Sequence, residues 1–278
     1  MTELDYDALR ALPMSQIRSH IRAGGYRGQT AGFAPGNLQA NLVVLGDGFA
    51  DDFHAFCLEN ARPCPLVGVS GRGDPIMRDL GDIDIRTDIP SYNIYRDGIL
   101  ETAVPDIAAL WTDDMVAFAL GCSFSFERAL ADAGIRMKHI EANRTVAMYA
   151  TNIELTSVGR FAGEMVVSMR PIPKKQVDLA IEVTTAYPHA HGAPIHVGNG
   201  EAIGISDIDS PDWGEAAQFE ADEVPVFWAC GVTPQNVLSR AAPPLCITHT
   251  PGRMLVTDLT EDEAKLRDAP GLDWRQAG

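Results

Sequence analysis

Two cysteines occupy matching positions in two segments of the sequence. Cys122 lies in DDMVAFALGCSFSFERAL (113–130), and Cys230 lies in DEVPVFWACGVTPQNVL (222–238). In each segment an acidic pair and an apolar run lead into a Gly/Cys dipeptide and then a polar helix start. Backbone N–H groups and the helix dipole there could lower the pKa of a thiol or bind an oxyanion or carboxylate. The alternative is that both cysteines are small, buried apolar residues.

Polar side chains accompany both predicted helix starts. Ser123 or Ser125 can cap the first helix, and Thr233 with Pro234 marks the start of the second. Glu127 lies about one turn into the first helix. It could face the same pocket as a general base, or it could be a solvated helix residue.

The match between the two segments continues beyond the cysteines. His139 and Arg144 precede a Thr-Asn-Ile tripeptide that contains Asn152, and His249 and Arg253 precede a Thr-Asp-Leu tripeptide. We interpret the match as a degenerate duplication that places two similar loops about a pseudo-twofold axis. Because imidazole titrates near neutral pH, the two histidines could carry protons. The alternative for each is a structural histidine.

The net charge sets a condition on any anionic substrate. Lys and Arg number 22 against 38 Asp and Glu, which gives −16 at pH 7. A small carboxylate would therefore need a locally positive pocket, and the planar fork of arginine suits it. Arg86 lies between Asp84 and Asp88, so local neutralisation is expected there. The candidate substrate-binding side chains are Arg86, Arg144, Asn152, Arg170, Arg253, Ser123 and Thr233.

Three histidines lie within the eight residues HAHGAPIH. His189 and His191, at i and i+2, would point to one side of an extended strand, and His196 follows nearby, so a metal site is conceivable. No carboxylate or cysteine at ligand spacing completes it, which favours a substrate loop or a structural turn. The sequence requires no cofactor, and a divalent metal is the alternative.

The elements that must position these side chains mix helices and strands. The segment 144–197 predicts a β-β-α-β unit, which suits a small two-layer insert. Ahead of it, hydrophobic spacing predicts a helix at 13–23, a strand at 38–45, a helix at 49–58, a strand at 65–69 and a hairpin at 92–100.

Composition excludes several classes of protein. The acidic balance disfavours nucleic acid and anionic membrane surfaces as partners, because the field repels phosphates. The apolar stretches are far shorter than the roughly 20 residues of a membrane helix. Five widely spaced cysteines and an acidic start without a signal-peptide pattern favour reduced thiols in the cytoplasm. A homo-oligomer is compatible with the sequence.

Several distinctive blocks lie between about residue 32 and residue 259. They are GFAPGNLQANLVVL, RPCPL, DIDIRTDIPSYNIYRDG, VAFALGCSFSFE, HIE, MYATNI, VVSMRPI, HGAPIHVGN, VPVFWACGVTPQ and ITHTPGRMLVTDL. Together these blocks resemble the D-glutamate cyclase family, whose bacterial members are generally described as hydro-lyases. The resemblance implies a mixed α/β fold: a three-layer αβα domain (1–133 and 203–278) interrupted by a two-layer α+β domain (134–202).

The resemblance also implies a reaction such as D-glutamate to 5-oxo-D-proline plus water, by a hydro-lyase acting on a small amino or carboxylic acid. Such a reaction needs amine deprotonation, oxyanion stabilisation and protonation of the leaving oxygen. Our candidate catalytic residues are Cys122, Glu127, His139, Cys230 and His249. One alternative is a cofactor-independent racemase that uses the two thiols as acid and base. Another is a non-catalytic protein that binds a small acid.

Overall fold

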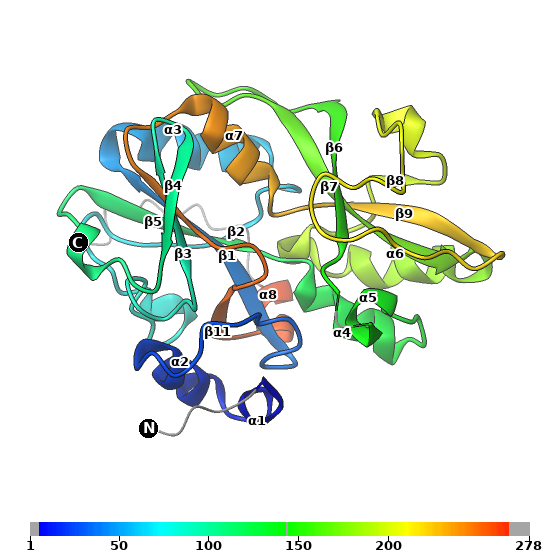
Figure 1. Cartoon of the computed structure of the whole chain (residues 1–278), viewed down its shortest axis with the longest axis horizontal. Coiled ribbons are helices and arrows are strands. Elements are labelled where there is room, and N and C mark those ends of the chain that lie inside the picture. The colour runs from blue at the N-terminus through cyan, green and yellow to red at the C-terminus, as the bar shows by residue number, and fades with distance from the viewer. Residues whose placement is uncertain (1–5, 143, 267–278) are drawn as a thin grey trace.

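The computed structural model describes residues 6–142 and 144–266, in which two β-sheets lie side by side (Figure 1). The predicted mixed α/β class is confirmed. No helix in the described ranges is long and apolar enough to cross a membrane. The described helices are α1 (Tyr6–Arg10), α2 (Met14–Arg22), α3 (Asp47–Glu59), α4 (Phe124–Asp132), α5 (Lys138–Glu141), α6 (Val177–Thr185), α7 (Thr233–Ala241) and α8 (Glu261–Leu266).

The first sheet has seven strands built around β1. Its path runs β2-β5-β1-β10-β3-β4, and β11 also pairs with β1. All these pairings are antiparallel. The long apolar run of β1 suits this position, because neighbours and covering layers bury almost every residue of it. The strands are β1 (Asn37–Gly46), β2 (Leu66–Val69), β3 (Tyr92–Arg96), β4 (Ile99–Val104), β5 (Met115–Gly121), β10 (Cys246–His249) and β11 (Leu255–Thr260).

The second sheet has four strands in the order β6-β7-β9-β8, also antiparallel. The predicted β-β-α-β elements are present as β6, β7, α6 and β8. However, β9 pairs between β7 and β8, so this sheet extends beyond the predicted boundary at residue 202. Residues Val226–Ala229 of β9 are buried. The position of β9 between two other strands of the sheet accounts for this burial. The strands are β6 (Ala147–Glu154), β7 (Glu164–Pro173), β8 (His196–Val197) and β9 (Glu223–Ala229).

The two sheets share one hydrophobic core. Phe118 of β5, Phe53 of α3, Val167 of β7 and Phe227 of β9 belong to the same buried cluster. The opposite face of β7 carries Ser168 and Arg170, since side chains alternate along a strand. There α4 and α6 pack against the second sheet. This alternation places Arg170 between β7 and the helices that pack on it.

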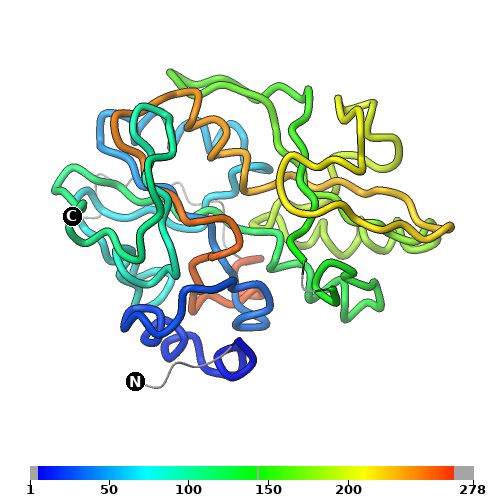
Figure 2. The backbone as a smooth tube through the Cα atoms, in the orientation of Figure 1, coloured from blue at the N-terminus to red at the C-terminus, as the bar shows by residue number. Residues whose placement is uncertain are grey.

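The chain crosses from one sheet to the other at two junctions (Figure 2). Cys122 lies between β5 and α4 at the first junction, and Cys230 lies between β9 and α7 at the second. Both cysteines thus occupy strand-to-helix junctions, as the sequence predicts. The internal duplication and the three-layer arrangement stay predictions.

The predicted helix caps are wrong in their chemistry. Ser123 occupies the N-cap position of α4, but its hydroxyl makes no capping hydrogen bond and instead accepts one from Arg170. In the second helix Val232 is the N-cap residue, and Thr233 is the first helical residue. The Thr233 hydroxyl donates to the carbonyl of Val166 and accepts from its N–H. Groups on β7 therefore engage both hydroxyls.

Candidate active site

Arg170 lies at the centre of a buried polar cluster between β7 and α4. Its Nε and Nη2 atoms donate to Glu127 Oε1 at 3.1 and 2.5 Å. Nη1 donates to Ser168 Oγ at 3.0 Å, and Nη2 also donates to Ser123 Oγ at 3.1 Å. These four residues and His139 are called the Arg170 cluster below. Arg170 is 2% exposed, and internal partners satisfy most of its guanidinium donors.

Two aromatic rings complete the surroundings of the guanidinium. Its central carbon lies 5.2 Å from the ring centroid of Phe126 and 5.4 Å from that of Trp228. Cation–π attraction is strongest where the cation is desolvated, as here. The rings also shield the ion pair from water, which strengthens its electrostatic coupling.

Glu127 joins Arg170 to His139. His139 Nε2 lies 3.0 Å from the same Glu127 oxygen that Arg170 contacts. Burial acts to raise the pKa of Glu127, but the charges and hydrogen bonds of His139 and Arg170 outweigh it and lower that pKa to about 2. Glu127 is therefore a carboxylate at neutral pH. It is 3% exposed, so the alternative of a solvated helix residue is wrong.

Cys122 and Cys230 lie beside this cluster, close enough to Arg170 and to each other for their charges to interact. Burial raises the pKa of Cys122 to about 12 and that of Cys230 to about 11. Backbone N–H groups at the junctions oppose the rise, but the cost of desolvating a thiolate is larger. The predicted lowering of the thiol pKa values is therefore wrong, and both thiols are protonated at neutral pH.

We expect the single variants Cys122→Ala and Cys230→Ala to retain turnover within about tenfold of wild type, because a protonated thiol is a poor nucleophile and base. Turnover of each purified variant and the rate of native alkylation by iodoacetamide measure this. A loss above about a thousandfold, or rapid alkylation of the native protein near neutral pH, would instead assign a thiolate to the reaction.

His249 lies in the first sheet, on β10. Its Nδ1 accepts a hydrogen bond from the Leu42 N–H at 3.1 Å, and burial lowers its pKa to about 4. A neutral imidazole bonded to a neighbouring strand fits the structural alternative. The contacts of His249 are with β1 and α7 rather than with the Arg170 cluster.

The burial of His191 and His249 should make the free energy of unfolding depend on pH. Burial lowers the pKa of both His191 and His249 to about 4, against 6.5 in the unfolded chain. The unfolded state therefore binds more protons between these values, and the free energy of unfolding should fall as pH drops from about 6.5 to about 4. Urea titrations across this window measure the fall. His249→Gln should reduce its slope, and an unchanged slope would contradict the assignment.

The predicted metal-binding histidines have other partners. His191 Nδ1 lies 2.7 Å from the Arg62 carbonyl, and His196 Nε2 lies 2.8 Å from the Asn199 carbonyl. His189 precedes them in a short 3-10 turn, Pro188–Ala190. Within 6–142 and 144–266, no three or more His, Cys, Asp or Glu side chains are arranged to hold a metal ion.

The remaining predicted binding side chains lie outside the Arg170 cluster. Arg86 is neutralised locally, as expected, because its guanidinium pairs with Asp84 at 2.8 Å. The Thr233 hydroxyl is hydrogen-bonded to the backbone of Val166 on β7. Of the others, Arg144 lies 3.4 Å from Glu215, Asn152 is exposed on β6, and Arg253 is half-buried in the loop between β10 and β11.

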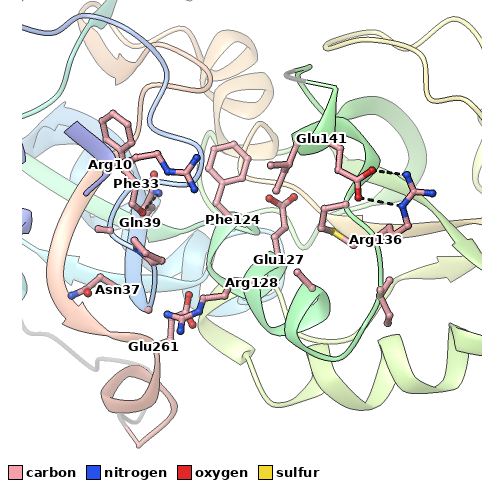
Figure 3. Close-up of a pocket in the computed structure, with 18 of the residues that line it drawn as sticks. Arg10, Phe33, Asn37, Gln39, Phe124, Glu127, Arg128, Arg136, Glu141 and Glu261 are labelled. Carbon is pink, nitrogen blue, oxygen red and sulfur yellow. Dashed lines mark hydrogen bonds and ion pairs between the residues drawn. The ribbon is translucent and has the colours of Figure 1, made fainter. Parts of the chain in front are cut away.

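A cavity of about 430 Å³ lies beside the cluster (Figure 3). One face of α4, with Phe124, Glu127, Arg128 and Ala131, forms a wall of it. These positions follow the helical spacing i, i+3, i+4 and i+7, a pattern that is visible in the sequence. The other lining residues include several that the sequence did not indicate, among them Arg10, Phe33, Asn37, Gln39, Arg136, Glu141 and Glu261.

The charges of this cavity are balanced. Three arginines, Arg10, Arg128 and Arg136, line it together with three glutamates, one of which is Glu127. The expected positive pocket is therefore not found here. Burial raises the pKa of the lining residue Glu261 to about 7, which weakens the negative side of the balance near neutral pH.

A second cavity, also of about 430 Å³, adjoins the first, because Arg136 and Glu141 line both. His139 and Arg144 line the second cavity together with Met169 of β7. Glu127 lines the first cavity and His139 the second, and the two side chains are 3.0 Å apart.

The chain is similar to known proteins over most of its length. A family model described as D-glutamate cyclase matches residues 116–258. A "Putative hydro-lyase" of Jannaschia sp. (strain CCS1) is 56% identical over 247 residues, which cover 88% of this chain and 93% of that protein. Another from Cupriavidus taiwanensis is 55% identical over 244 residues, which cover 87% and 91%.

A solved structure gives a weaker similarity. The crystal structure of a nitrogen repressor-like protein from Methanococcus jannaschii covers 84% of this chain and 90% of its own, with 9% identity and a TM-score of 0.37.

Proposed function

Because the chain belongs to the D-glutamate cyclase family, we propose that it is a hydro-lyase that converts D-glutamate to 5-oxo-D-proline and water. The observation that supports this most is the placement of Glu127. It is a buried carboxylate held by Arg170, in contact with His139, at the wall of a cavity large enough for a small amino acid.

The reaction requires only an internal transfer of protons. The amino nitrogen forms a bond to the γ-carboxyl carbon, and one carbon–oxygen bond of that carboxyl breaks. The ammonium loses two protons, and both leave with the departing oxygen as water. Charge balances, since an ammonium and a carboxylate become a neutral amide. The site must therefore take protons from a nitrogen and return them to an oxygen nearby.

Glu127 and His139 are the groups placed to perform this transfer. The carboxylate attracts the ammonium and holds His139, whose Nε2 lies 3.0 Å from it, and His139 accepts the first proton. The same pair then returns protons to the leaving oxygen. Because His139 also lines the second cavity, it can exchange a proton there between turnovers.

Arg170 acts as a positioning residue. Its guanidinium is occupied by Glu127 and two serines, so we assign it to holding the carboxylate rather than to clamping the substrate. A racemase that uses the two cysteines would need a thiolate, which the raised pKa values of both thiols disfavour. Cytoplasmic location and homo-oligomerisation stay predictions.

The proposed function is tested first by a substrate screen. Small amino and carboxylic acids are compared by thermal shift, since a ligand of the folded state raises apparent stability. Acids that bind are then incubated with the protein, and mass spectrometry detects products that have lost one water. We expect D-glutamate to bind and to yield 5-oxoproline. Product from a different acid, or from none, would contradict the proposed reaction.

Replacing His139 by glutamine should lower kcat by about 10²–10⁴-fold with a smaller change in KM, because proton transfer contributes on this scale. His196→Gln, a histidine on β8, is the matched control and should keep both kcat and KM. A His139→Gln enzyme with the wild-type kcat would remove His139 from the proton pathway.

A further inference from the structure

Gln39 has a buried oxygen atom without a partner. It lies on β1 and is 3% exposed. Its Nε2 donates to the carbonyls of Thr30 and Phe33 at 2.9 and 3.1 Å. Because carbonyls only accept hydrogen bonds, these two contacts fix which end of the amide is NH₂. Oε1 is then the free end, and it has no hydrogen-bond partner among the described residues.

An unsatisfied buried acceptor needs an explanation. Because leaving such an atom unpaired costs folding free energy, these atoms are few, and each calls for a specific explanation such as a functional role or a bound water or ion. Gln39 lines the same cavity as Glu127 (Figure 3). In the described part of the chain, the hydrogen bonds and ion pairs of the Glu127 carboxylate all involve Oε1. Two acceptor residues therefore line the cavity, Gln39 with a partnerless amide oxygen and Glu127 with a carboxylate.

Two acceptors, one of them charged, fit a cationic donor. A primary ammonium has three donors and a single positive charge, which suits an amide oxygen and a carboxylate together. Arg10 and Arg128, whose ion pairs with Asp7 and Asp132 are long at 3.8 and 3.5 Å, could then face the carboxylates of the same ligand. A dicarboxylic acid without an amino group would leave both acceptors unpaired.

We propose that Gln39 is a specificity-determining residue whose Oε1 accepts a hydrogen bond from the ammonium group of an amino-acid ligand, with Glu127 as the counter-charge. This inference rests on the proposed function for the orientation of the ligand, because that function places the amine at the Glu127 carboxylate. It adds a residue from β1 to a site otherwise built from α4, α5 and β7.

The test compares two acids that differ only in the ammonium group. D-aspartate and succinate carry the same two carboxylates, and neither can close a five-membered lactam, so binding is measured without turnover. Calorimetric titrations give the ratio of their affinities in wild type, Gln39→Met and Gln39→Glu. Both variants lose the amide donors to Thr30 and Phe33, but only Gln39→Glu keeps an oxygen acceptor. Gln235→Met, the same substitution at a residue that does not line the cavity, is the control.

We expect wild type and Gln235→Met to bind D-aspartate at least about tenfold more tightly than succinate. In Gln39→Met the ratio of the two affinities should fall about tenfold, whereas in Gln39→Glu it should stay at the wild-type value. Equal affinities in wild type, an unchanged ratio in Gln39→Met, the same loss in both Gln39 variants, or no binding of either acid would overturn the proposal. Formation of 5-oxoproline by wild type is measured separately, so failure here is distinguishable from failure of the proposed function.

Discussion

Replacing Glu127 by glutamine should reduce the turnover of D-glutamate by about 10²–10⁴-fold in a protein that still folds. Glutamine keeps the shape of the side chain and one oxygen that can accept from Arg170. It removes the negative charge that attracts the ammonium and holds His139. The measurement is kcat and KM from the rate of 5-oxoproline formation, with circular dichroism as a check of folding.

The matched control is Glu164→Gln. Glu164 begins β7, the strand that carries Arg170, and pairs with Arg240 at 2.5 Å on the surface. The same chemical change there should leave turnover within about twofold of wild type. Equal turnover in the Glu127→Gln and Glu164→Gln enzymes would exclude Glu127 from the chemistry.

Replacing Arg170 by methionine should lower the free energy of unfolding by about 3–5 kcal/mol, because it leaves a carboxylate buried without its main partner. The pKa of Glu127 should rise in this variant, since burial favours the neutral form once the guanidinium is gone. Urea unfolding at neutral pH measures the loss. Arg240→Met, which breaks the exposed pair with Glu164, should cost about 0–1 kcal/mol.

The double variant Arg170→Met/Glu127→Gln distinguishes an ion pair from simple packing. Without either charge the desolvation penalty disappears, so the double variant should be more stable than Arg170→Met alone. Activity should not return, because Glu127 is missing. Additive losses of stability would show that the two side chains contribute independently and would contradict a coupled pair.

The sequence was sufficient to predict most elements of the fold, because apolar spacing is local. It predicted the helix that became α2, the strand that became β1 and both strand-to-helix junctions at the cysteines. Pairing in the second sheet could not be read this way. A buried run such as β9 can join either sheet, and only its neighbours in space decide which.

The candidate site was predicted in part. Arg170, Glu127, His139 and Ser123 were all candidates, and the structure brings these four together. Their partnership depends on which face of β7 meets which face of α4, and spacing along the chain does not determine that. The thiol pKa values show the same limit, because a helix start is visible in the sequence, while the burial that outweighs it is a property of the folded protein. Gln39 gave no signal, since its relevance depends on how its side-chain amide is turned: the NH₂ group donates to the carbonyls of Thr30 and Phe33, and the oxygen has no partner.

The central claim is that this site removes water from D-glutamate by moving protons through Glu127 and His139. It is tested most directly by incubating the protein with D-glutamate deuterated at Cα and following substrate and product by mass spectrometry and NMR. The account predicts 5-oxo-D-proline well above the spontaneous rate, with the Cα deuterium retained and with product nearly absent for Glu127→Gln. Loss of the Cα deuterium to solvent, or 5-oxoproline no faster than in buffer alone, would contradict it.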